Sequence, residues 1–364
     1  MTDRPTGYLV LADGTVFEGE LAGAIPETSV AGEVVFNTSM TGYQEILTDP
    51  SYAGQFVVFT TAHLGNYGTN PVDDESSGVW CGAAIMGDLA DRASNYRSTE
   101  DLDAFALRHG CTILCGVDTR RLTRHLRDHG ALPGVIGHGP LETLKEAAAT
   151  AQGTDAQDLA TVVSTDVAYE LPGGPHRLVV VDFGVKVTML RQLQSFAHLT
   201  VVPATTSADE IRSLDPTGLF LSNGPGDPAA LGSPVEMIGD LLGELPIFGI
   251  CLGHQLLSRA LGATTFKLPF GHHGGNHPVV DLATGHVEIT AQNHNYAVDG
   301  DSLRDVLVTH RNLNDGVIEG ISALERKAFS VQYHPEAGPG PHDARYLFHR
   351  FTTLLEGGLH ATAS

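Results

Sequence analysis

From residue 177 onward, short apolar runs alternate with segments whose apolar residues recur at helical spacing. Short apolar runs are typical of buried strands, and the helical periodicity between them is typical of crossover helices. The pattern therefore predicts an α/β fold with a doubly wound, mainly parallel sheet and right-handed crossovers. The predicted strands are 177–182, 199–203, 218–222, 246–250, 287–290, 306–309 and 328–333, and the predicted helices are 186–196, 208–214, 234–242, 252–261 and 346–355.

The first 140 residues have a different pattern of apolar and polar positions. Residues 8–11 and 15–17 are apolar runs on either side of Asp13-Gly14, a pair typical of a hairpin turn. Strand-like composition over 32–37 and 112–114, and helical spacing over 102–109 and 118–129, extend the pattern. These features predict a mixed, β-rich N-terminal α/β domain.

The composition shifts again between these two parts. An Ala-rich helical stretch follows Pro140, and a polar segment ends in Leu171-Pro172-Gly173-Gly174-Pro175. A chain of 364 residues exceeds the usual size of a single core. We therefore predict an N-terminal domain over 1–140, an interdomain segment over 141–175 and an α/β domain over 176–364.

The formal net charge of −22 argues against nucleic acid or an anionic membrane as a partner. No apolar run is long enough to cross a bilayer, and the first residues lack the charged-then-apolar pattern of a secretion signal, so we expect a cytoplasmic location. The helix predicted over 118–129 carries four basic residues in this acidic chain: Arg120, Arg121, Arg124 and Arg127. That basic face either contacts a partner or is simply solvated.

Four cysteines are too few for a disulfide scaffold in a chain of this length, so reduced thiols are expected. Cys111 and Cys115 bracket an apolar run, which favours core packing over zinc binding. A histidine cluster, His272, His273 and His277, lies among the glycines of 271–278. Since no acidic residue or cysteine within the cluster has a matching spacing, we expect a loop there and no metal.

The most informative stretch is Gly249-Ile250-Cys251-Leu252-Gly253, which lies between the strand predicted over 246–250 and the helix predicted over 252–261. Gly-x-Cys-x-Gly at such a junction is the cysteine form of a nucleophile elbow. The sharp turn requires small neighbours, and the first turn of the helix offers unpaired N–H groups that favour a thiolate. Cys251 alone is more often an inert core residue, so its role depends on a partner.

A proton-shuttling partner is available in Tyr333-His334-Pro335-Glu336, directly after a predicted strand. Residues two apart in extended backbone face the same side, so Glu336 can fix the tautomer of His334. Cys251, His334 and Glu336 together suit acyl transfer at an amide, through thiolate attack, a thioester and water.

A second loop, Ser222 to Pro228, follows the strand predicted over 218–222. Gly224 and Gly226 bracket a proline there, an arrangement that can aim N–H groups at a developing oxyanion, with the Leu252 N–H as the other donor. Taken by itself, the sequence of this loop is also typical of a tight turn. It lacks the lysine and Ser/Thr of a phosphate-binding loop, so no nucleotide is assigned to it.

Together, the elbow, the Gly224–Pro228 loop and His334-Pro335-Glu336 resemble a class I glutamine amidotransferase domain. Three further stretches, 37–52, 271–278 and 290–298, are similar to the small, glutamine-hydrolysing subunit family of carbamoyl phosphate synthetase. The resemblance covers about residues 9–355.

This resemblance implies that Cys251 attacks the carboxamide of glutamine, His334 shuttles protons and Glu336 orients His334. It also implies a set of L-glutamine-binding residues: Ser51, Gly224, Gly226, Leu252, Gln255, Asn293, Asn295 and Tyr296. Ser51 would bring the N-terminal domain into the glutamine pocket. Asn295 stands where some relatives have glycine, and because asparagine tolerates a positive φ, the backbone contact is expected to survive.

The family further implies a division of labour. This chain would release ammonia through an internal tunnel to a large synthetase subunit, in a heterodimer or a higher oligomer of heterodimers. ATP and Mg are expected on that partner, which makes carbamoyl phosphate for arginine and pyrimidine synthesis, and no cofactor is expected in this chain. Two alternatives remain open: the glutaminase of another synthase, and a catalytically dead regulatory relative.

Overall fold

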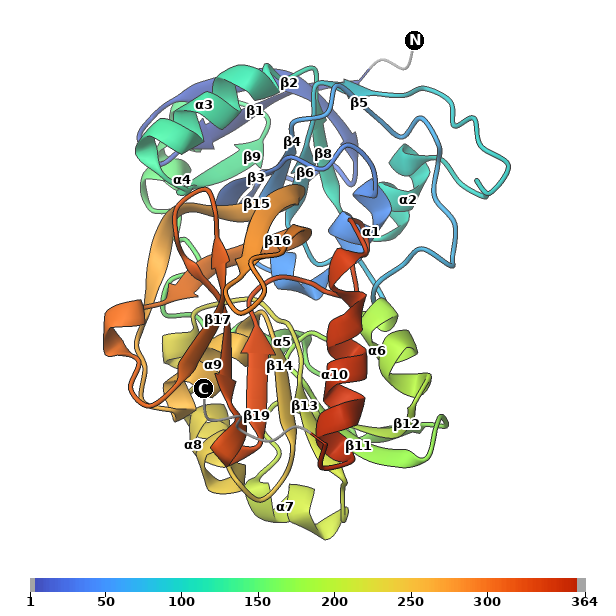
Figure 1. The fold of residues 1–364 in the computed structure, drawn as a ribbon. Helices are drawn as coiled ribbons and strands as arrows, with labels where there is room; N and C mark the ends of the chain where they lie inside the picture. The colour runs from blue at the N-terminus through green and yellow to red at the C-terminus, as the bar shows by residue number, and fades with distance from the viewer. Residues whose placement is uncertain (1–3, 359–364) are drawn as a thin grey trace. The chain divides into compact units, whose positions relative to one another are not determined.

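The computed structural model describes residues 4–358 and divides into two compact units (Figure 1). The N-terminal unit comprises the residues up to Asp155 together with Pro269–His273. The C-terminal unit comprises Ala156–Leu268 and the residues from Gly274 onward. Each unit has hydrophobic clusters of its own.

The N-terminal unit is a closed barrel with the strand order β1-β2-β8-β6-β4-β3-β9. Its strands are β1 (Thr6–Leu11), β2 (Val16–Gly23), β3 (Ser29–Asn37), β4 (Gln55–Phe59), β6 (Ala83–Ile85), β8 (Thr112–Cys115) and β9 (Leu132–Gly137). Outside the barrel lie the short pair β5 (His63–Leu64) and β7 (Asp88–Leu89) and the helices α1 (Tyr43–Thr48), α2 (Leu102–Arg108), α3 (Thr119–His129) and α4 (Leu141–Ala149).

Alternation along the strands explains the barrel. Leu9 and Leu11 of β1 belong to one cluster to which every barrel strand contributes, together with Leu122 and Leu126 of α3. Val10, between them, packs instead with α4. Because successive side chains of a strand point to opposite faces, one alternate set fills the interior, where α3 also packs, and the other set packs against α1, α2 and α4. The predicted hairpin is confirmed, since β1 and β2 pair antiparallel.

The C-terminal unit is built on a ten-stranded sheet with the order β10-β12-β11-β13-β14-β19-β18-β17-β15-β16. The run from β12 to β19 is parallel, and the strands beyond β19 continue it antiparallel where their pairing is given. The strands are β10 (Tyr169–Leu171), β11 (His176–Asp182), β12 (Ala197–Pro203), β13 (Gly218–Leu221), β14 (Ile247–Ile250), β15 (Thr265–Asp281), β16 (Val287–Val298), β17 (Leu307–Asn312), β18 (Ile318–Ala323) and β19 (Ala328–Val331). The helices are α5 (Ala160–Val163), α6 (Val187–Gln194), α7 (Ala208–Ser213), α8 (Gly232–Leu241), α9 (Leu252–Ala260) and α10 (Tyr346–Leu355).

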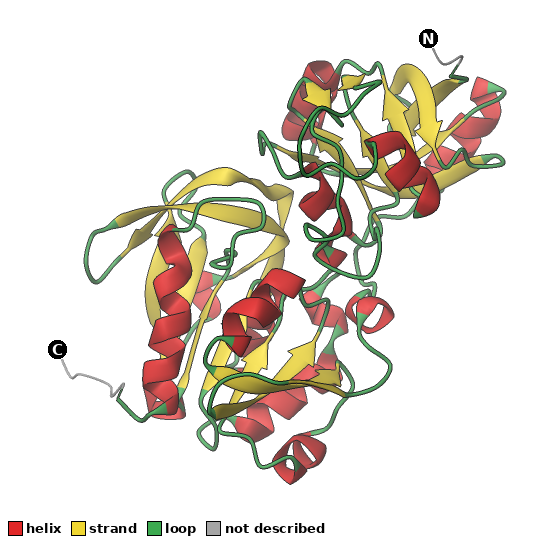
Figure 2. Ribbon diagram, turned by 90° about the vertical axis from the view of Figure 1, so that its right-hand side faces the viewer, coloured by secondary structure: helices red, strands yellow, loops and turns green. Residues whose placement is uncertain are grey.

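Helices cover both faces of the parallel part of this sheet (Figure 2). Val180 of β11 packs in a cluster with α6 and α10, whereas its neighbours Val179 and Val181 pack with α7, α8 and α9. Strands buried on both faces read as continuous apolar runs, which is the pattern found from residue 177 onward. The predicted fold class is therefore confirmed.

The N-terminal unit ends at Asp155, and the C-terminal unit begins at Ala156. The predicted interdomain segment, 141–175, is thus shared: α4 packs on β1 and β9 of the barrel, and residues from Ala156 onward belong to the C-terminal unit. Within residues 4–358, no helix is long and apolar enough to cross a membrane.

The prediction of a loop over 271–278 is wrong, because these residues lie within the long strand β15. Considered from the sequence alone, the glycines of this stretch favour a loop. Instead, the positive φ of Gly271 (69°) and Gly274 (148°) is accommodated inside an extended segment. Glycines within strands often mark such irregularities rather than chain reversals.

Aromatic packing joins the strand that precedes Cys251 to its neighbours. The ring of Phe248 stacks on Phe329 of β19, with centroids 4.4 Å apart, and meets Phe220 of β13 edge to face at 5.5 Å. Phe351 of α10 lies 5.5 Å away. Since Phe248 is fully buried among these rings, its replacement leaves a cavity that the surrounding groups cannot easily fill.

We expect Phe248→Ala to lower the free energy of unfolding by about 3–5 kcal/mol, because it combines lost burial with a cavity. Urea denaturation would measure this change. Phe266→Ala is the matched control, since Phe266 is 44% exposed, and it should cost under about 1 kcal/mol. Equal losses in the two variants would contradict the central role of Phe248.

Candidate active site

Cys251 lies at the turn between β14 and α9 with φ 54° and ψ −106°, a region that side-chain-bearing residues rarely occupy. The glycines on either side of it, Gly249 and Gly253, are required because the neighbouring backbone leaves no room for a side chain. A Cβ on Gly249 would lie 2.6 Å from the Gly253 carbonyl oxygen, and one on Gly253 would lie 2.2 Å from the Leu221 carbonyl oxygen. The strained backbone conformation of Cys251 costs about 1–3 kcal/mol and persists only where the surrounding structure enforces it. The geometry is that of a nucleophile elbow.

Strand pairing brings the predicted histidine to the same edge of the sheet. β14 and β19 are parallel, with Ile250 opposite Val331, and the Cys251 N–H donates to the Val331 carbonyl at 2.9 Å. His334 follows three residues after Val331, and its N–H donates to the Ala291 carbonyl of β16 at 2.9 Å. Both side chains therefore emerge at the carboxyl ends of adjacent strands, where open α/β sheets place their sites.

A buried chain of charged groups backs His334. Its Nδ1 lies 2.8 Å from Glu336 Oε1, and since a carboxylate can only accept, Nδ1–H is the donor. Lys186 Nζ donates to the same oxygen at 2.9 Å. Nε2 of His334 is buried and has no hydrogen-bond partner among residues 4–358. The predicted contact between His334 and Glu336 is thus present, and Nε2 remains available for proton transfer.

These charges shift the pKa values of both groups. Burial alone would lower the pKa of His334, but the charges of Glu336 and Cys251 outweigh it and raise that pKa to about 10. Burial would raise the pKa of Glu336, but the charges of Lys186 and His334 outweigh it and hold that pKa at about 2. At neutral pH the imidazolium and the carboxylate are therefore both charged.

Lys186, which contacts Glu336, is not among the site residues predicted from the sequence. Asp182 at the end of β11 accepts the N–H groups of Gly184 and Val185, at 2.9 and 2.8 Å, and so shapes the turn that delivers the lysine. A single lysine between two valines, four residues after the end of a buried parallel strand, is a signal for it, because a buried lysine requires a carboxylate. Its partner, however, lies 150 residues away in the chain.

The predicted oxyanion loop leaves the same edge of the sheet. β13 pairs with β14, so that Leu221 lies opposite Gly249, and Ser222 accepts the Gly253 N–H at 3.0 Å. A Cβ on Gly224 would lie 2.1 Å from the Phe183 carbonyl oxygen, and Gly226 has a φ of 91°. Leu252 begins α9 with its side chain buried, so it can offer a substrate only its backbone. Gly224, Gly226 and Leu252 are thus held by the elements that hold Cys251.

Three further predicted residues lie on β16 beside this edge. Cys251 Sγ lies 3.4 Å from the Asn293 carbonyl oxygen, and the Gln255 amide donates to the Tyr296 carbonyl at 2.8 Å. Asn295 lies between them and is not among the non-glycine residues of 4–358 that have a positive φ. The backbone there therefore requires neither glycine nor the tolerance of asparagine. Gln255 also donates to Gln332 at 3.1 Å.

Ser51 belongs to the N-terminal unit. It is buried in the short 3-10 helix Pro50–Tyr52, where its N–H donates to Asp49 Oδ1 at 2.9 Å. Its place beside the other predicted glutamine-binding residues stays a prediction.

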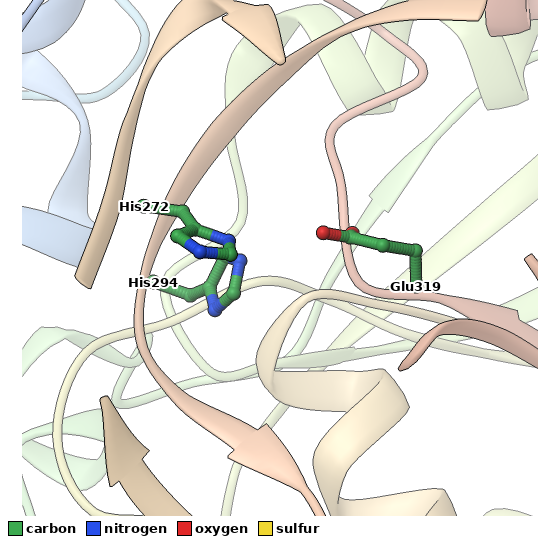
Figure 3. A group of neighbouring side chains, drawn as sticks. All are labelled: His272, His294 and Glu319. Carbon is green, nitrogen blue, oxygen red and sulfur yellow. The ribbon is translucent and has the colours of Figure 1, made fainter. Parts of the chain in front are cut away.

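Figure 3 draws His294 of β16 and Glu319 of β18 together with His272 of β15. Both ring nitrogens of His294 already have partners, Gln292 Oε1 at 2.9 Å and the Tyr296 carbonyl at 2.8 Å. Asn312 donates to Glu319 at 2.8 Å. The His294 and Glu319 side chains thus serve the internal bonding of the C-terminal unit, and the absence of a metal stays a prediction.

The structure also reveals two neutral buried histidines near the elbow. His254 of α9 contacts Ser330 Oγ through Nδ1 at 2.8 Å, and burial, aided by the charge of His310, lowers its pKa to about 3. Burial likewise lowers the pKa of His310 to about 4. The C-terminal unit therefore holds His254 and His310 neutral while it holds His334 charged.

Comparison with known proteins agrees with this geometry. Residues 179–354 match the family described as "Glutamine amidotransferase class-I", and residues 9–136 match "Carbamoyl-phosphate synthase small chain, CPSase domain". The C-terminal unit is thus a class I glutamine amidotransferase domain.

Relatives named carbamoyl phosphate synthase small chain match nearly the whole chain. The one from Syntrophotalea carbinolica is 50% identical and covers 96% of this chain and 97% of its own length. Those from Chlorobaculum tepidum and Escherichia coli are each 49% identical, with the same two coverages. The chain therefore belongs to the carbamoyl phosphate synthase small chain family.

We expect Lys186→Met to destabilise the protein by about 3–5 kcal/mol, because it leaves the buried Glu336 carboxylate without its ammonium partner. Urea denaturation measures the loss. Adding Glu336→Gln to Lys186→Met should recover part of it, whereas two independent residues would give additive losses. Lys327→Met, at an exposed lysine, is the control and should have little effect.

We expect the two neutral histidines to make the protein acid-sensitive. Their folded pKa values lie below 6.5, so the stability they contribute is complete above that pH and is lost as pH falls towards 4 for His310 and 3 for His254. Between pH 7.5 and pH 5 each should remove about 2 kcal/mol. His334 acts in the opposite direction, because its pKa is raised in the folded state. The stability that it contributes is complete below pH 6.5 and is lost as the pH rises towards 10.

Comparison of variants isolates this contribution. His254→Gln should lose about 2 kcal/mol less than the parent protein over the same pH interval, and the exposed His349→Gln should lose as much as the parent. Equal pH dependence in His254→Gln and the parent would show that His254 is not held neutral.

Proposed function

We propose that this chain is the glutamine-hydrolysing subunit of a carbamoyl phosphate synthase. It hydrolyses L-glutamine to glutamate and ammonia through a cysteinyl thioester. The observation that carries the proposal is the convergence of Cys251, His334 and Glu336 at one edge of the sheet, in a chain that belongs to this family along nearly its whole length.

Cys251 is the nucleophile. With His334 as imidazolium, the sulfur reacts as a thiolate, and it attacks the side-chain amide carbon of glutamine. The negative charge then develops on the amide oxygen. The N–H groups of Leu252 and Gly224 are the donors we assign to that oxygen, because they belong to the elbow and to the loop tied to it.

His334 carries the proton in both halves of the reaction. From Nε2 it protonates the departing nitrogen, ammonia leaves, and the thioester remains on Cys251. The neutral imidazole then takes a proton from water, which attacks the thioester and releases glutamate. Glu336 keeps the Nδ1–H tautomer throughout, and Lys186 keeps Glu336 ionised.

The rest of the predicted set binds the substrate in this proposal. Gly224, Gly226 and Leu252 offer backbone groups, and Gln255, Asn293, Asn295, Tyr296 and Ser51 complete the L-glutamine site. The glycines matter because backbone must approach the substrate closely where a side chain would collide.

Carbamoyl phosphate itself requires bicarbonate and ATP, and the sequence of this chain shows no nucleotide-binding motif. We therefore infer a large partner subunit that holds ATP and Mg and receives the ammonia through an internal tunnel. A tunnel keeps the ammonia reactive, because free ammonia would be protonated and diluted in water. A cytoplasmic heterodimer serving arginine and pyrimidine synthesis fits this scheme. The match of residues 9–136 argues against the glutaminase of another synthase.

We expect Cys251→Ser to lower glutamine hydrolysis by about 10³-fold or more, since the hydroxyl is a far weaker nucleophile at this site. With the cognate large subunit present, synthesis from added ammonia should be preserved. Denaturing quench of the parent protein during turnover, followed by digestion, should yield a glutamyl adduct on Cys251.

Cys115→Ser is the matched control, since this buried thiol of the N-terminal unit donates to the Glu20 carbonyl at 3.4 Å and accepts from Arg4 at 3.7 Å, and a hydroxyl can do both. It should keep glutamine hydrolysis. Persistent hydrolysis in Cys251→Ser, or an adduct on another residue, would refute the proposed nucleophile.

A further inference from the structure

Helix α3 of the N-terminal unit concentrates positive charge in a chain of net charge −22. It has 11 residues, and four of the 21 lysines and arginines of the chain lie in it: Arg120, Arg121, Arg124 and Arg127. All four are exposed, whereas Leu122 and Leu126 face the barrel core. Like charges four residues apart destabilise a helix, so this arrangement has a local cost that the fold itself does not require.

A groove of about 710 Å³ runs between this helix and the end of the β1–β2 hairpin. Val16 and Phe17 line it on the hairpin side, and Arg120, Arg121 and Arg124 line it on the helix side. The Arg121 guanidinium lies 4.1 Å from the centre of the Phe17 ring and donates to the Val16 carbonyl at 2.7 Å. Because Arg121 is already ordered, less side-chain entropy is lost when a ligand binds it.

The acidic groups of the groove are engaged within the unit. Asp118 caps α3 by accepting the Arg121 N–H at 2.8 Å, and Asp13 contacts His125 Nε2 at 2.6 Å. Asp128 pairs with Arg127 at 2.8 Å. In contrast, the side chains of Arg120 and Arg124 have no hydrogen bond or ion pair with any of residues 4–358. The groove therefore presents the guanidinium groups of Arg120 and Arg124, the latter near the charge of Asp128, beside the ordered Arg121.

We propose that this groove, between α3 and the β1–β2 hairpin, is a docking surface for a carboxylate-rich segment of the large synthase subunit. The inference rests on the proposed function, because that function supplies the partner. Guanidinium groups bind carboxylates in paired hydrogen bonds, and the half-buried Val16 on the hairpin side can contact an apolar group next to them. A protein surface offers both kinds of group.

A nucleic acid fits the groove less well. Its phosphates would also bind arginine, but a polyanion is repelled by the net charge of −22 over the whole approach, whereas a protein partner needs only a local acidic patch. Charge complementarity of this kind acts mainly on the association rate and on the choice of partner.

The test is charge reversal on the intact chain, with binding to the cognate large subunit measured by surface plasmon resonance or interferometry. Arg120→Glu combined with Arg124→Glu should weaken binding by about tenfold or more near 100 mM salt, mostly through slower association, and the difference should narrow near 500 mM salt. The milder Arg120→Ala/Arg124→Ala pair should weaken binding in the same direction but less.

Arg92→Glu combined with Arg326→Glu is the matched control, since both arginines are exposed and the change in net charge is identical. This control should bind within about threefold of the parent. Glutamine hydrolysis by the isolated chain should be the same in all variants, because none of these residues belongs to the proposed catalytic site. Thermal unfolding checks that each variant is folded.

The outcomes separate this inference from the proposed function. Parent-like binding by the Arg120/Arg124 variants, or equal weakening in the control, would overturn the docking surface. So would a loss of binding to a short single-stranded DNA probe while binding to the large subunit is kept. If the parent chain itself hydrolyses no glutamine and binds no large subunit, the proposed function is what fails.

Discussion

The parallel pairing of β14 with β19 is the constraint on which the site depends. With Ile250 opposite Val331, the chain leaves both strands at one edge, and the Cys251 N–H is still held by the Val331 carbonyl. A shift of one residue in this register would reverse the facing of every side chain on the strand. The stacked rings of Phe248 and Phe329 hold that register from within the sheet.

Once this strand pairing has placed the side chains, burial and the neighbouring charges determine the charge states of Glu336 and His334. A buried carboxylate is costly unless it is paired, and Glu336 meets both Lys186 and His334. The same low-dielectric environment that would neutralise a lone histidine, as it does at His254, strengthens the interaction of His334 with its neighbours. His334 is therefore charged and His254 neutral, because His334 lies beside a carboxylate and His254 does not.

Much of this arrangement could be predicted from local sequence. The strand–turn–helix pattern around Cys251 and the two-residue spacing of His334 and Glu336 are short-range signals, and the structure contains the corresponding geometry. Lys186 could not be identified in this way, because its meaning depends on a carboxylate far along the chain. The prediction for 271–278 is wrong for a different reason: its glycines favour a loop, but pairing with other strands decides whether such a segment is extended.

The crowding of Gly253 against Leu221 has a mechanical consequence. The Gly253 backbone is pressed against the Leu221 carbonyl and bonded to the Ser222 carbonyl, so the elbow and the start of the neighbouring loop have no freedom to slide past each other. The position of the sulfur is therefore tied to the conformation of the loop that begins at Ser222.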